Sequence, residues 1–352
     1  MKKIISFALV ILVITQVCFS VERVAKPVLK FRSEGRFKIV QFTDVHFRYD
    51  SYRSDSALNM MKTVIALEKP DLVVLTGDIV CSKNTAKAWV SLSKVFIDAK
   101  VPWAVMLGNH DPQDELTKAQ IIQTNAGFPY NLTENGPEKI SGNGNYILKV
   151  QSSSTTKTTA LLYCLDSQMG LDTITDLGDY QWFDFSQIEW YRKMSGQFTN
   201  QNGGRPLPSL AFFHIPLPEY KEVVGKNTTV GSQDESISSA NLNSGMYTAM
   251  LESKDVMGIF VGHDHNNNYI GCLHNICLAF GYSSGRQSYG SIGKGARVIE
   301  LYEGLRKFDT CVVKMYECDR DKDIWLPVKD RQPKYFVTYP DSFKDPKPGI
   351  SK

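Results

Sequence analysis

The chain has 352 residues, of which 42% are hydrophobic and 22% are charged, a composition typical of a globular protein with a large core. The formal net charge is +3, and Lys2 and Lys3 at the extreme N-terminus account for two of these charges. The remaining +1 gives no electrostatic basis for binding nucleic acid or an anionic membrane surface, so neither is expected as a partner.

The first twenty residues are typical of a secretory signal peptide. Two lysines precede an apolar stretch over residues 4–17, and the segment ends on the small residue Ser20. A membrane-spanning helix needs about 20 apolar residues, so cleavage is favoured over an anchor. We expect a signal peptide at 1–20, one domain at 21–340 and a polar tail at 341–352. No stable membrane association is expected after cleavage, and the mature protein is expected to be secreted or to enter a lysosomal or vacuolar lumen.

Alternating strand and helix patterns follow along the chain. Apolar runs that end in polar clusters predict strands, and apolar residues at helical spacing between them predict helices. The expected strands are at residues 37–46, 71–78, 101–111, 160–167, 209–216, 257–265, 276–281, 296–302 and 311–316, and the expected helices at 54–69, 85–99, 114–124 and 184–194. This order predicts an α/β core in which helices pack on sheets.

Six cysteines remain after the leader, and in an oxidising compartment they allow up to three disulfides. Two candidate pairs are close in sequence: Cys272 with Cys277, and Cys311 with Cys318. Asn131 and Asn227 begin Asn-x-Thr sequons, which are allowed glycosylation sites in a secreted protein.

Five of the six histidines lie at the polar ends of predicted strands. An isolated His-x-His is more often a surface loop than a metal site. Here, however, the polar clusters share one position in the strand pattern, and ligands of α/β sheets bind beyond the carboxyl ends of strands. The clusters are Asp44-Val45-His46, Gly77-Asp78, Gly108-Asn109-His110-Asp111, His214 and Gly262-His263-Asp264-His265.

This ordered set of motifs resembles that of the calcineurin-like metallophosphoesterase superfamily. The stretches "EKPDLVVLTGD", "FFHIPLPEY" and "GHDHNNNY" resemble its small single-domain branch, which is labelled purple-acid-phosphatase-like. The resemblance covers residues 37–302 and implies an α/β fold, a four-layer α/β/β/α sandwich of two mixed sheets flanked by helices.

The resemblance also implies a set of metal ligands and catalytic groups. Asp78 would bridge two ions, with Asp44, His46 and His265 completing one site and Asn109, His214 and His263 completing the other. Such mixed ligands suit Fe, Zn or Mn better than calcium. His110 would lie beside the ions, stabilise the phosphoryl oxygens and protonate the leaving alkoxide, and Asp111 would orient its ring. Asn109, His110 and Arg48 are candidate substrate contacts, although an exposed loop arginine is the simpler interpretation of Arg48.

The implied function is a secreted dinuclear metal-dependent phosphatase. It would hydrolyse phosphate monoesters of small molecules by attack of a metal-bound hydroxide. A phosphodiesterase on the same scaffold and a catalytically silent phosphate-binding protein remain the alternatives. The sequence departs from the purple enzymes three residues after Asp78, where Cys81 replaces the tyrosine that colours them.

Overall fold

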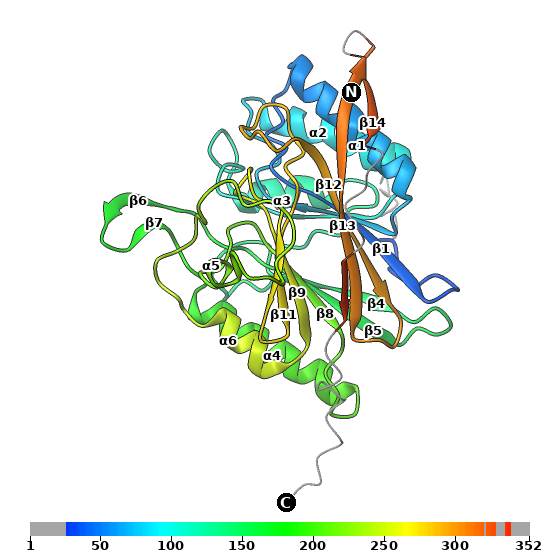
Figure 1. Cartoon of the computed structure of the whole chain (residues 1–352), viewed down its shortest axis with the longest axis vertical. Helices are drawn as coiled ribbons and strands as arrows, with labels where there is room; N and C mark the ends of the chain where they lie inside the picture. The colour runs from blue at the N-terminus through cyan, green and yellow to red at the C-terminus, as the bar shows by residue number, and fades with distance from the viewer. Residues whose placement is uncertain (1–25, 320–321, 329–334, 339–352) are drawn as a thin grey trace, which may run out of the picture.

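The computed structural model describes residues 26–319, 322–328 and 335–338 (Figure 1). The expected signal peptide at 1–20 and the expected tail at 341–352 therefore lie outside the described residues. Within the described part of the chain, no helix is both long and apolar enough to cross a membrane.

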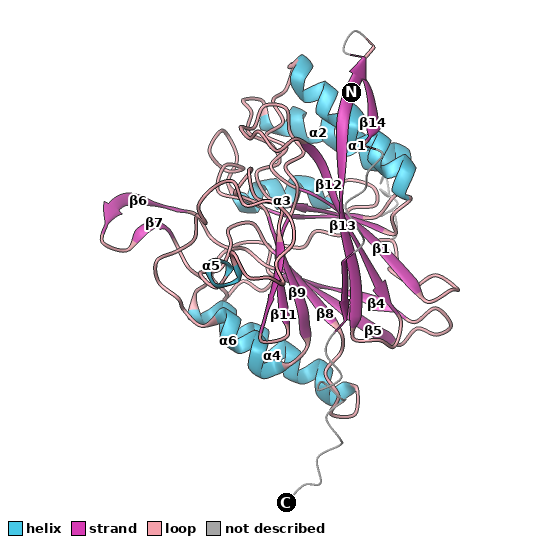
Figure 2. Cartoon of the chain, in the orientation of Figure 1, coloured by secondary structure: helices cyan, strands magenta, loops and turns pink. Residues whose placement is uncertain are grey.

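Two large mixed sheets form the centre of the molecule (Figure 2). The first contains, in spatial order, β14 (Ile324–Pro327), β13 (Lys307–Asp319), β12 (Lys294–Tyr302), β1 (Arg36–Phe42), β2 (Leu72–Thr76) and β3 (Trp103–Met106), and β15 (Tyr335–Thr338) also pairs with β13. The second contains β10 (Ile270–Leu273), β11 (Ile276–Phe280), β9 (Val256–Val261), β8 (Ser209–Phe212), β5 (Thr158–Cys164) and β4 (Tyr146–Gln151). A separate hairpin, β6 (Gly170–Thr175) and β7 (Gly178–Tyr180), projects from the body of the molecule at the left of Figure 1.

Helices cover the outer face of each sheet, which confirms the predicted four-layer α/β/β/α arrangement. The first sheet packs against α1 (Tyr52–Glu68), α2 (Thr85–Ala99) and α3 (Lys118–Ala126), and the second against α4 (Phe185–Gln201), α5 (Tyr220–Val223) and α6 (Met246–Ser253). The side chains of strand β2 contact two different layers. Val73 and Leu75 face the helices, whereas Leu72 and Val74 face the other sheet, as the two-residue period of a strand requires.

The parallel strands bring the polar clusters to one edge of the sandwich. Strands β1, β2 and β3 are parallel neighbours, and so are β5, β8, β9 and β11. The carboxyl ends of parallel strands meet at the same edge of a sheet. The segments that follow β1, β2, β3, β8 and β9 are therefore gathered beside one another.

Two helices differ in length from the prediction. The helix expected from residue 114 begins only at Lys118, because the side chains of Thr117 and Gln120 form a reciprocal capping box at its start. The helix expected to end at residue 194 continues to Gln201, and its added turns bury Ser195 and Phe198 against the second sheet.

The predicted Cys272–Cys277 disulfide is present and joins the adjacent strands β10 and β11. The second candidate pair is wrong. Cys311 and Cys318 lie seven residues apart on the single strand β13, which places their Cα atoms roughly 23 Å apart, whereas a disulfide needs less than about 7 Å. Cys81 and Cys164 are also thiols.

The two predicted glycosylation sites have opposite environments. Asn227 is exposed, in a loop after α5. Asn131 is 2% exposed, its Oδ1 accepts a hydrogen bond from the backbone amide of Thr133, and its Nδ2 is shielded from solvent. Of the two predicted sites, Asn227 is therefore the one whose side chain is accessible in the folded protein.

Candidate metal centre

Unusual backbone conformations direct the polar side chains toward one point. Asp44, His46, Asp78 and His263 all have positive φ angles, of 53°, 45°, 53° and 79°. Residues other than glycine seldom adopt this left-handed conformation, and where they do, the cost is commonly held at a functional site. Four such residues at the ends of three strands define the candidate centre.

Two motif glycines are required because side chains of the centre occupy the space beside them. A Cβ atom at Gly262 would lie 1.9 Å from Thr43 Oγ1, and one at Gly108 would lie 2.2 Å from Asp78 Oδ1. Thr43 Oγ1 in turn donates to Asp44 Oδ2 at 2.8 Å. Any larger residue at either glycine would displace a carboxylate of the centre.

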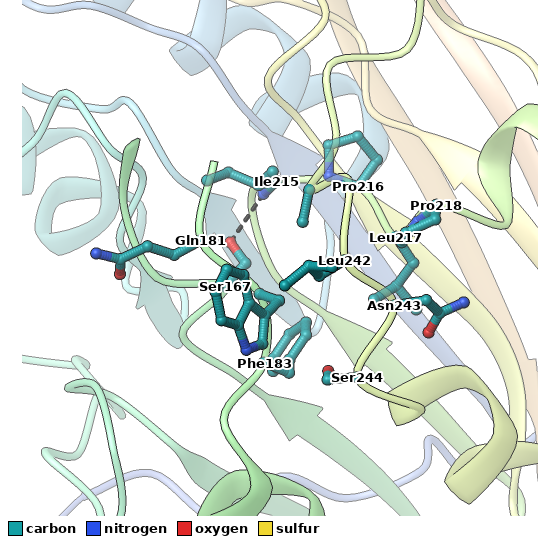
Figure 3. Close-up of a pocket in the computed structure, with 12 residues that line it drawn as sticks. Ser167, Gln181, Phe183, Ile215, Pro216, Leu217, Pro218, Leu242, Asn243 and Ser244 are labelled. Atoms are coloured by element: carbon teal, nitrogen blue, oxygen red, sulfur yellow. Dashed lines mark hydrogen bonds between the residues drawn. The ribbon is translucent and has the colours of Figure 1, made fainter. Parts of the chain in front are cut away.

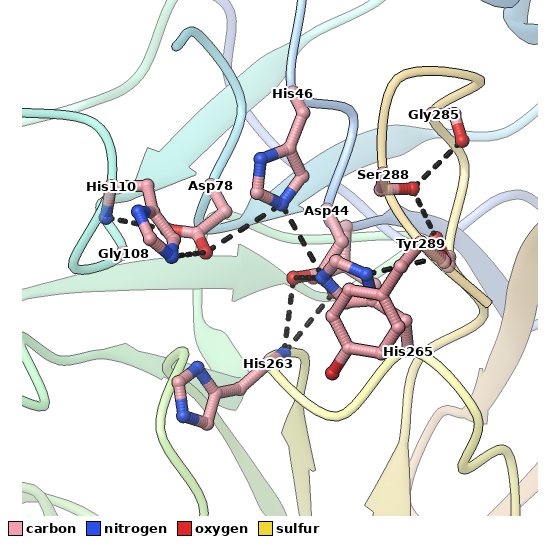
Figure 4. Close-up of polar contacts among 12 residues, drawn as sticks. Asp44, His46, Asp78, Gly108, His110, His263, His265, Gly285, Ser288 and Tyr289 are labelled. Atoms are coloured by element: carbon pink, nitrogen blue, oxygen red, sulfur yellow. Dashed lines mark hydrogen bonds and ion pairs between the residues drawn. The ribbon is translucent and has the colours of Figure 1, made fainter. Parts of the chain in front are cut away.

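Asp44, His46 and His265 form the first of two groups of converging donor atoms (Figure 4). His265 Nε2 lies 3.2 Å from Asp44 Oδ1 and 3.3 Å from His46 Nε2. The second group consists of Asp78, His214 and His263. His214 Nε2 lies 3.1 Å from Asp78 Oδ2 and 3.3 Å from His263 Nδ1. In each group the donor atoms lie within 4.8 Å of one another, close enough to surround a single ion.

Asp78 lies between the two groups. Its Oδ2 is 3.1 Å from His214 Nε2 in the second group and 3.7 Å from His46 Nε2 in the first. Its Oδ1 accepts a hydrogen bond from the backbone amide of His110 at 2.8 Å. This leaves one carboxylate oxygen facing both groups, the position that a bridging ligand must occupy.

Asn109 supplies a further oxygen atom, Oδ1, that could bind a cation. The residue is 8% exposed, and its Oδ1 is buried without a hydrogen-bond partner among the described residues. An unpaired buried carbonyl oxygen is costly, and a bound cation would remove that cost. The donor set of two carboxylates, four imidazoles and one amide therefore fits two transition-metal ions.

Hydrogen bonds fix which nitrogen of two imidazoles faces the centre. His214 Nδ1 lies 2.8 Å from the carbonyl oxygen of Thr76, and His265 Nδ1 lies 3.2 Å from that of Tyr289. A carbonyl oxygen only accepts, so in each ring Nδ1 carries a proton, and Nε2 is the nitrogen that faces the centre. The ring of Tyr289 also stacks on that of His265, with centroids 3.9 Å apart.

Protonation states in three members of the centre favour cation binding at neutral pH. Burial opposes ionisation of Asp44, but His265 outweighs this and lowers the pKa of Asp44 to about 2. Burial lowers the pKa of His46 to about 4 and, together with the charge of His214, that of His263 to about 3. One ionised carboxylate and two neutral imidazoles are thus available without any loss of protons.

His214 and Asp78 behave differently because they form a buried pair. Burial alone would lower the pKa of His214, but Asp78 raises it to about 9, and the pKa of Asp78 is lowered in return by His214. A cation bound by His214 Nε2 must displace its proton, so metal affinity at this group should fall as the pH falls below about 9.

His110 is half-exposed, with 43% of its side chain accessible, whereas the residues of the two ligand groups are largely buried. Its Nε2 lies 4.0 Å from Asp78 Oδ2, and its Nδ1 lies 2.7 Å from Gln113 Oε1. The orienting role predicted for Asp111 is therefore wrong, because Gln113 occupies that position. Gln113 follows His110 by three residues in a tight turn, in which the backbone amide of Gln113 donates to the carbonyl oxygen of His110 at 3.3 Å.

Asp111 instead holds the backbone of the centre together. Its carboxylate accepts hydrogen bonds of 2.7–2.9 Å from the backbone amides of Asp78, Ile79, Val80 and Gly108. It thereby fixes the turn that carries Asp78 against the turn that carries Asn109.

Replacing Asp111 with alanine should therefore be a stability mutation. The change leaves four amides without their acceptor, and the expected loss is about 3 kcal/mol of unfolding free energy. Denaturant unfolding of the metal-free protein measures this loss directly. A variant as stable as the wild type would show that water replaces the carboxylate at no cost.

The remaining predicted contacts lie at the edge of the site. Arg48 is exposed, and its backbone amide donates to Ser54 Oγ at 2.8 Å. Ser167 Oγ accepts hydrogen bonds from the backbone amides of His214 at 3.3 Å and Ile215 at 2.8 Å, and Ser167 and Ile215 line a small pocket (Figure 3). Its volume is about 20 Å³, room for roughly one water molecule.

Comparison with known proteins agrees with this geometry. A family model described as calcineurin-like phosphoesterase matches residues 37–267. "Probable inactive purple acid phosphatase 29" of Arabidopsis thaliana is 35% identical over 304 residues, which cover 77% of this chain and 78% of the relative. "Phosphatase DCR2" of Saccharomyces cerevisiae is 32% identical over 313 residues, which cover 78% of this chain and 52% of that protein. The chain belongs to the calcineurin-like phosphoesterase family.

Solved structures show the same fold. The crystal structure of a dimetal phosphatase from Danio rerio matches with a TM-score of 0.53 at 12% sequence identity, covering 78% of this chain and 95% of that one. The name of the family denotes hydrolysis of phosphate esters. The present structure contains two groups of potential metal ligands.

Proposed function

We propose that the protein is an active dinuclear metal-dependent phosphatase that hydrolyses phosphate monoesters of small molecules. The observation that carries the proposal is the position of Asp78, whose Oδ2 faces His46 at 3.7 Å and His214 at 3.1 Å. Relatives such as the Arabidopsis protein are named as probable inactive enzymes, so activity is the point that needs a test. In this chain both ligand groups and His110 are intact, which favours catalysis over silent phosphate binding.

The ligand residues would hold the ions, and His110 would act on the substrate. When bound, two such ions supply charge neutralisation for the phosphoryl group and a lowered pKa for a water molecule. The half-exposed imidazole of His110 lies beside Asp78 and is held at Nδ1 by Gln113. Its Nε2 lies 4.0 Å from Asp78 Oδ2, beside the ligand groups, where it can donate a proton to the leaving alkoxide.

An assay with paired substrates tests the proposal. The protein loaded separately with zinc, manganese or iron is given an aryl phosphate monoester and the matching diester. We expect turnover of the monoester with at least one metal and a higher kcat/KM for it than for the diester. A preference for the diester would instead identify a phosphodiesterase. Full loading with two ions and no turnover of either ester would identify a silent binding protein.

We also propose that the protein acts outside the cytosol. The leader-like residues 1–20 and the Cys272–Cys277 disulfide support an oxidising compartment. N-terminal sequencing of protein recovered from the secretory route should find a start near residue 21. Recovery of intact residues 1–20 would contradict cleavage.

The iron-loaded protein should not be purple. The violet colour of purple acid phosphatases requires a tyrosinate on ferric iron, and Cys81 stands at the corresponding position here. His46, which converges with Asp44 and His265, would supply a nitrogen donor in its place. The visible absorption spectrum of the iron-loaded protein is the measurement. An intense violet band that disappears on replacing a nearby tyrosine, such as Tyr180 or Tyr289, would refute the assignment.

A further inference from the structure

The imidazole of His46 contacts a sulfur atom on the side away from the centre. Its Nδ1 lies 3.3 Å from Cys81 Sγ, whereas its Nε2 faces His265 Nε2 at 3.3 Å and Asp78 Oδ2 at 3.7 Å. The two nitrogens lie on opposite edges of the ring, so the sulfur lies behind the imidazole. Cys81 is therefore poorly placed to act as a metal ligand itself.

Backbone hydrogen bonds hold the cysteine in this position. The backbone amide of Phe47 donates to the carbonyl oxygen of Ile79 at 2.8 Å, and the backbone amide of Cys81 donates to the carbonyl oxygen of Phe47 at 3.1 Å. The amide of His46 donates to the carbonyl oxygen of Asp78 at 2.9 Å. These hydrogen bonds join the segments that carry His46 and Cys81 as a short parallel ladder. The backbone therefore holds the two side chains in contact.

Only one direction of this hydrogen bond is compatible with a metal ligand. If the thiol donated to Nδ1, the proton of the neutral ring would reside on Nε2, and that nitrogen could not bind a cation. If Nδ1–H donates to the sulfur, the lone pair of Nε2 is free to face the centre. His214 and His265 are held in the same tautomer, but by the carbonyl oxygens of Thr76 and Tyr289.

We propose that Cys81 is a positioning residue for His46, with Sγ accepting the Nδ1–H hydrogen bond and directing Nε2 toward the metal centre. The inference rests on the proposed function, because it assumes that Asp44, His46 and His265 hold an ion. Groups that orient a ligand histidine typically contribute 10–100-fold to metal affinity. Sulfur is a weak acceptor, so Cys81 should contribute about 10-fold, at the low end of that range.

Zinc binding by four proteins tests the proposal. Metal-free wild type, Cys81→Ala, Cys81→Ser and Cys318→Ser are each titrated with Zn²⁺ against a competing chelator. Cys318 is an exposed thiol on β13, so Cys318→Ser controls for the loss of a zinc-binding sulfur. We expect two equivalents in the wild type and in the control. Cys81→Ala should weaken one equivalent about 10-fold and leave the other unchanged, and Cys81→Ser, which retains an acceptor, should recover most of the loss.

A second readout reports on the hydrogen bond itself. In the zinc-loaded wild type, the Nδ1–H of His46 should give an imidazole N–H resonance that exchanges slowly with water. The same resonance should exchange rapidly in Cys81→Ala and remain protected in Cys318→Ser. Neither result is expected if Cys81 only fills space.

The outcomes separate the inference from the function on which it rests. Two unchanged zinc affinities in Cys81→Ala, or equal losses of both, would overturn the role of Cys81 while leaving the metal centre intact. Wild-type protein that binds no zinc would overturn the centre. If Cys81→Ala does not fold, Cys81→Ser decides the matter, because a rapidly exchanging Nδ1–H in a folded serine variant would also overturn the proposal.

Discussion

Replacing Asp78 with alanine should abolish phosphatase activity and weaken metal binding at both groups. Its Oδ2 lies between His46 and His214, so its removal deprives two closely spaced cations of the anion that screens their repulsion. Metal content after dialysis should fall from two equivalents toward zero. The expected loss of kcat is at least about 10³-fold, the scale associated with losing an electrostatic element of an active site.

A terminal ligand provides the matched control for this variant. Asp44 belongs to the first group alone, where its Oδ1 faces His265 Nε2 at 3.2 Å. Asp44→Ala should therefore lose about one equivalent of metal and retain the other. If Asp78→Ala instead retained two tightly bound ions, Asp78 would not be the bridging residue.

Replacing His110 with glutamine should remove most of the turnover while both ions remain bound. Glutamine can donate a hydrogen bond, but it cannot transfer a proton to a leaving alkoxide. The expected loss in kcat is about 10²–10⁴-fold, the usual contribution of a general acid. Metal analysis of the purified variant accompanies the kinetic measurement.

Gln113→Ala is the companion to that experiment. It leaves the His110 ring in place and removes only the partner of Nδ1, 2.7 Å away, so its loss of kcat should be smaller than that of His110→Gln. Loss of a full equivalent of metal in His110→Gln would show that His110 is a ligand and that its role as an acid is wrong.

The layers of the fold and the location of the centre could be predicted because both depend on patterns within short stretches of sequence. Apolar runs such as 71–78 are long enough to cross the buried interior, and the polar residues that follow them must lie at its edge. Because the strands are parallel neighbours, the residues that follow their carboxyl ends lie close together. Strand β4 was missed because its side chains alternate between buried and accessible positions at the edge of a sheet, and its pattern is weaker.

The groups that orient the ligands could not be predicted, because they depend on backbone positions that the sequence does not specify. The carbonyl oxygens of Thr76 and Tyr289 hold His214 and His265, and a carbonyl has no residue-type signature. Asp111 was misassigned for a related reason. Adjacency in sequence suggested contact with His110, whereas the turn at Gly108 directs its carboxylate to the backbone. A three-residue sequon likewise carries no information on burial, so the burial of Asn131 could not be predicted from it.

The dependence of activity on metal stoichiometry tests whether the two groups joined by Asp78 form one dinuclear catalytic centre. Metal-free protein is titrated with the ion that supports the highest activity, and hydrolysis of an aryl phosphate monoester is measured after each addition. The two groups joined by Asp78 predict negligible activity in the metal-free protein and full activity only when the second equivalent has bound. Activity that is complete at one equivalent, or absent from protein shown to hold two, would contradict a catalytic centre of two ions.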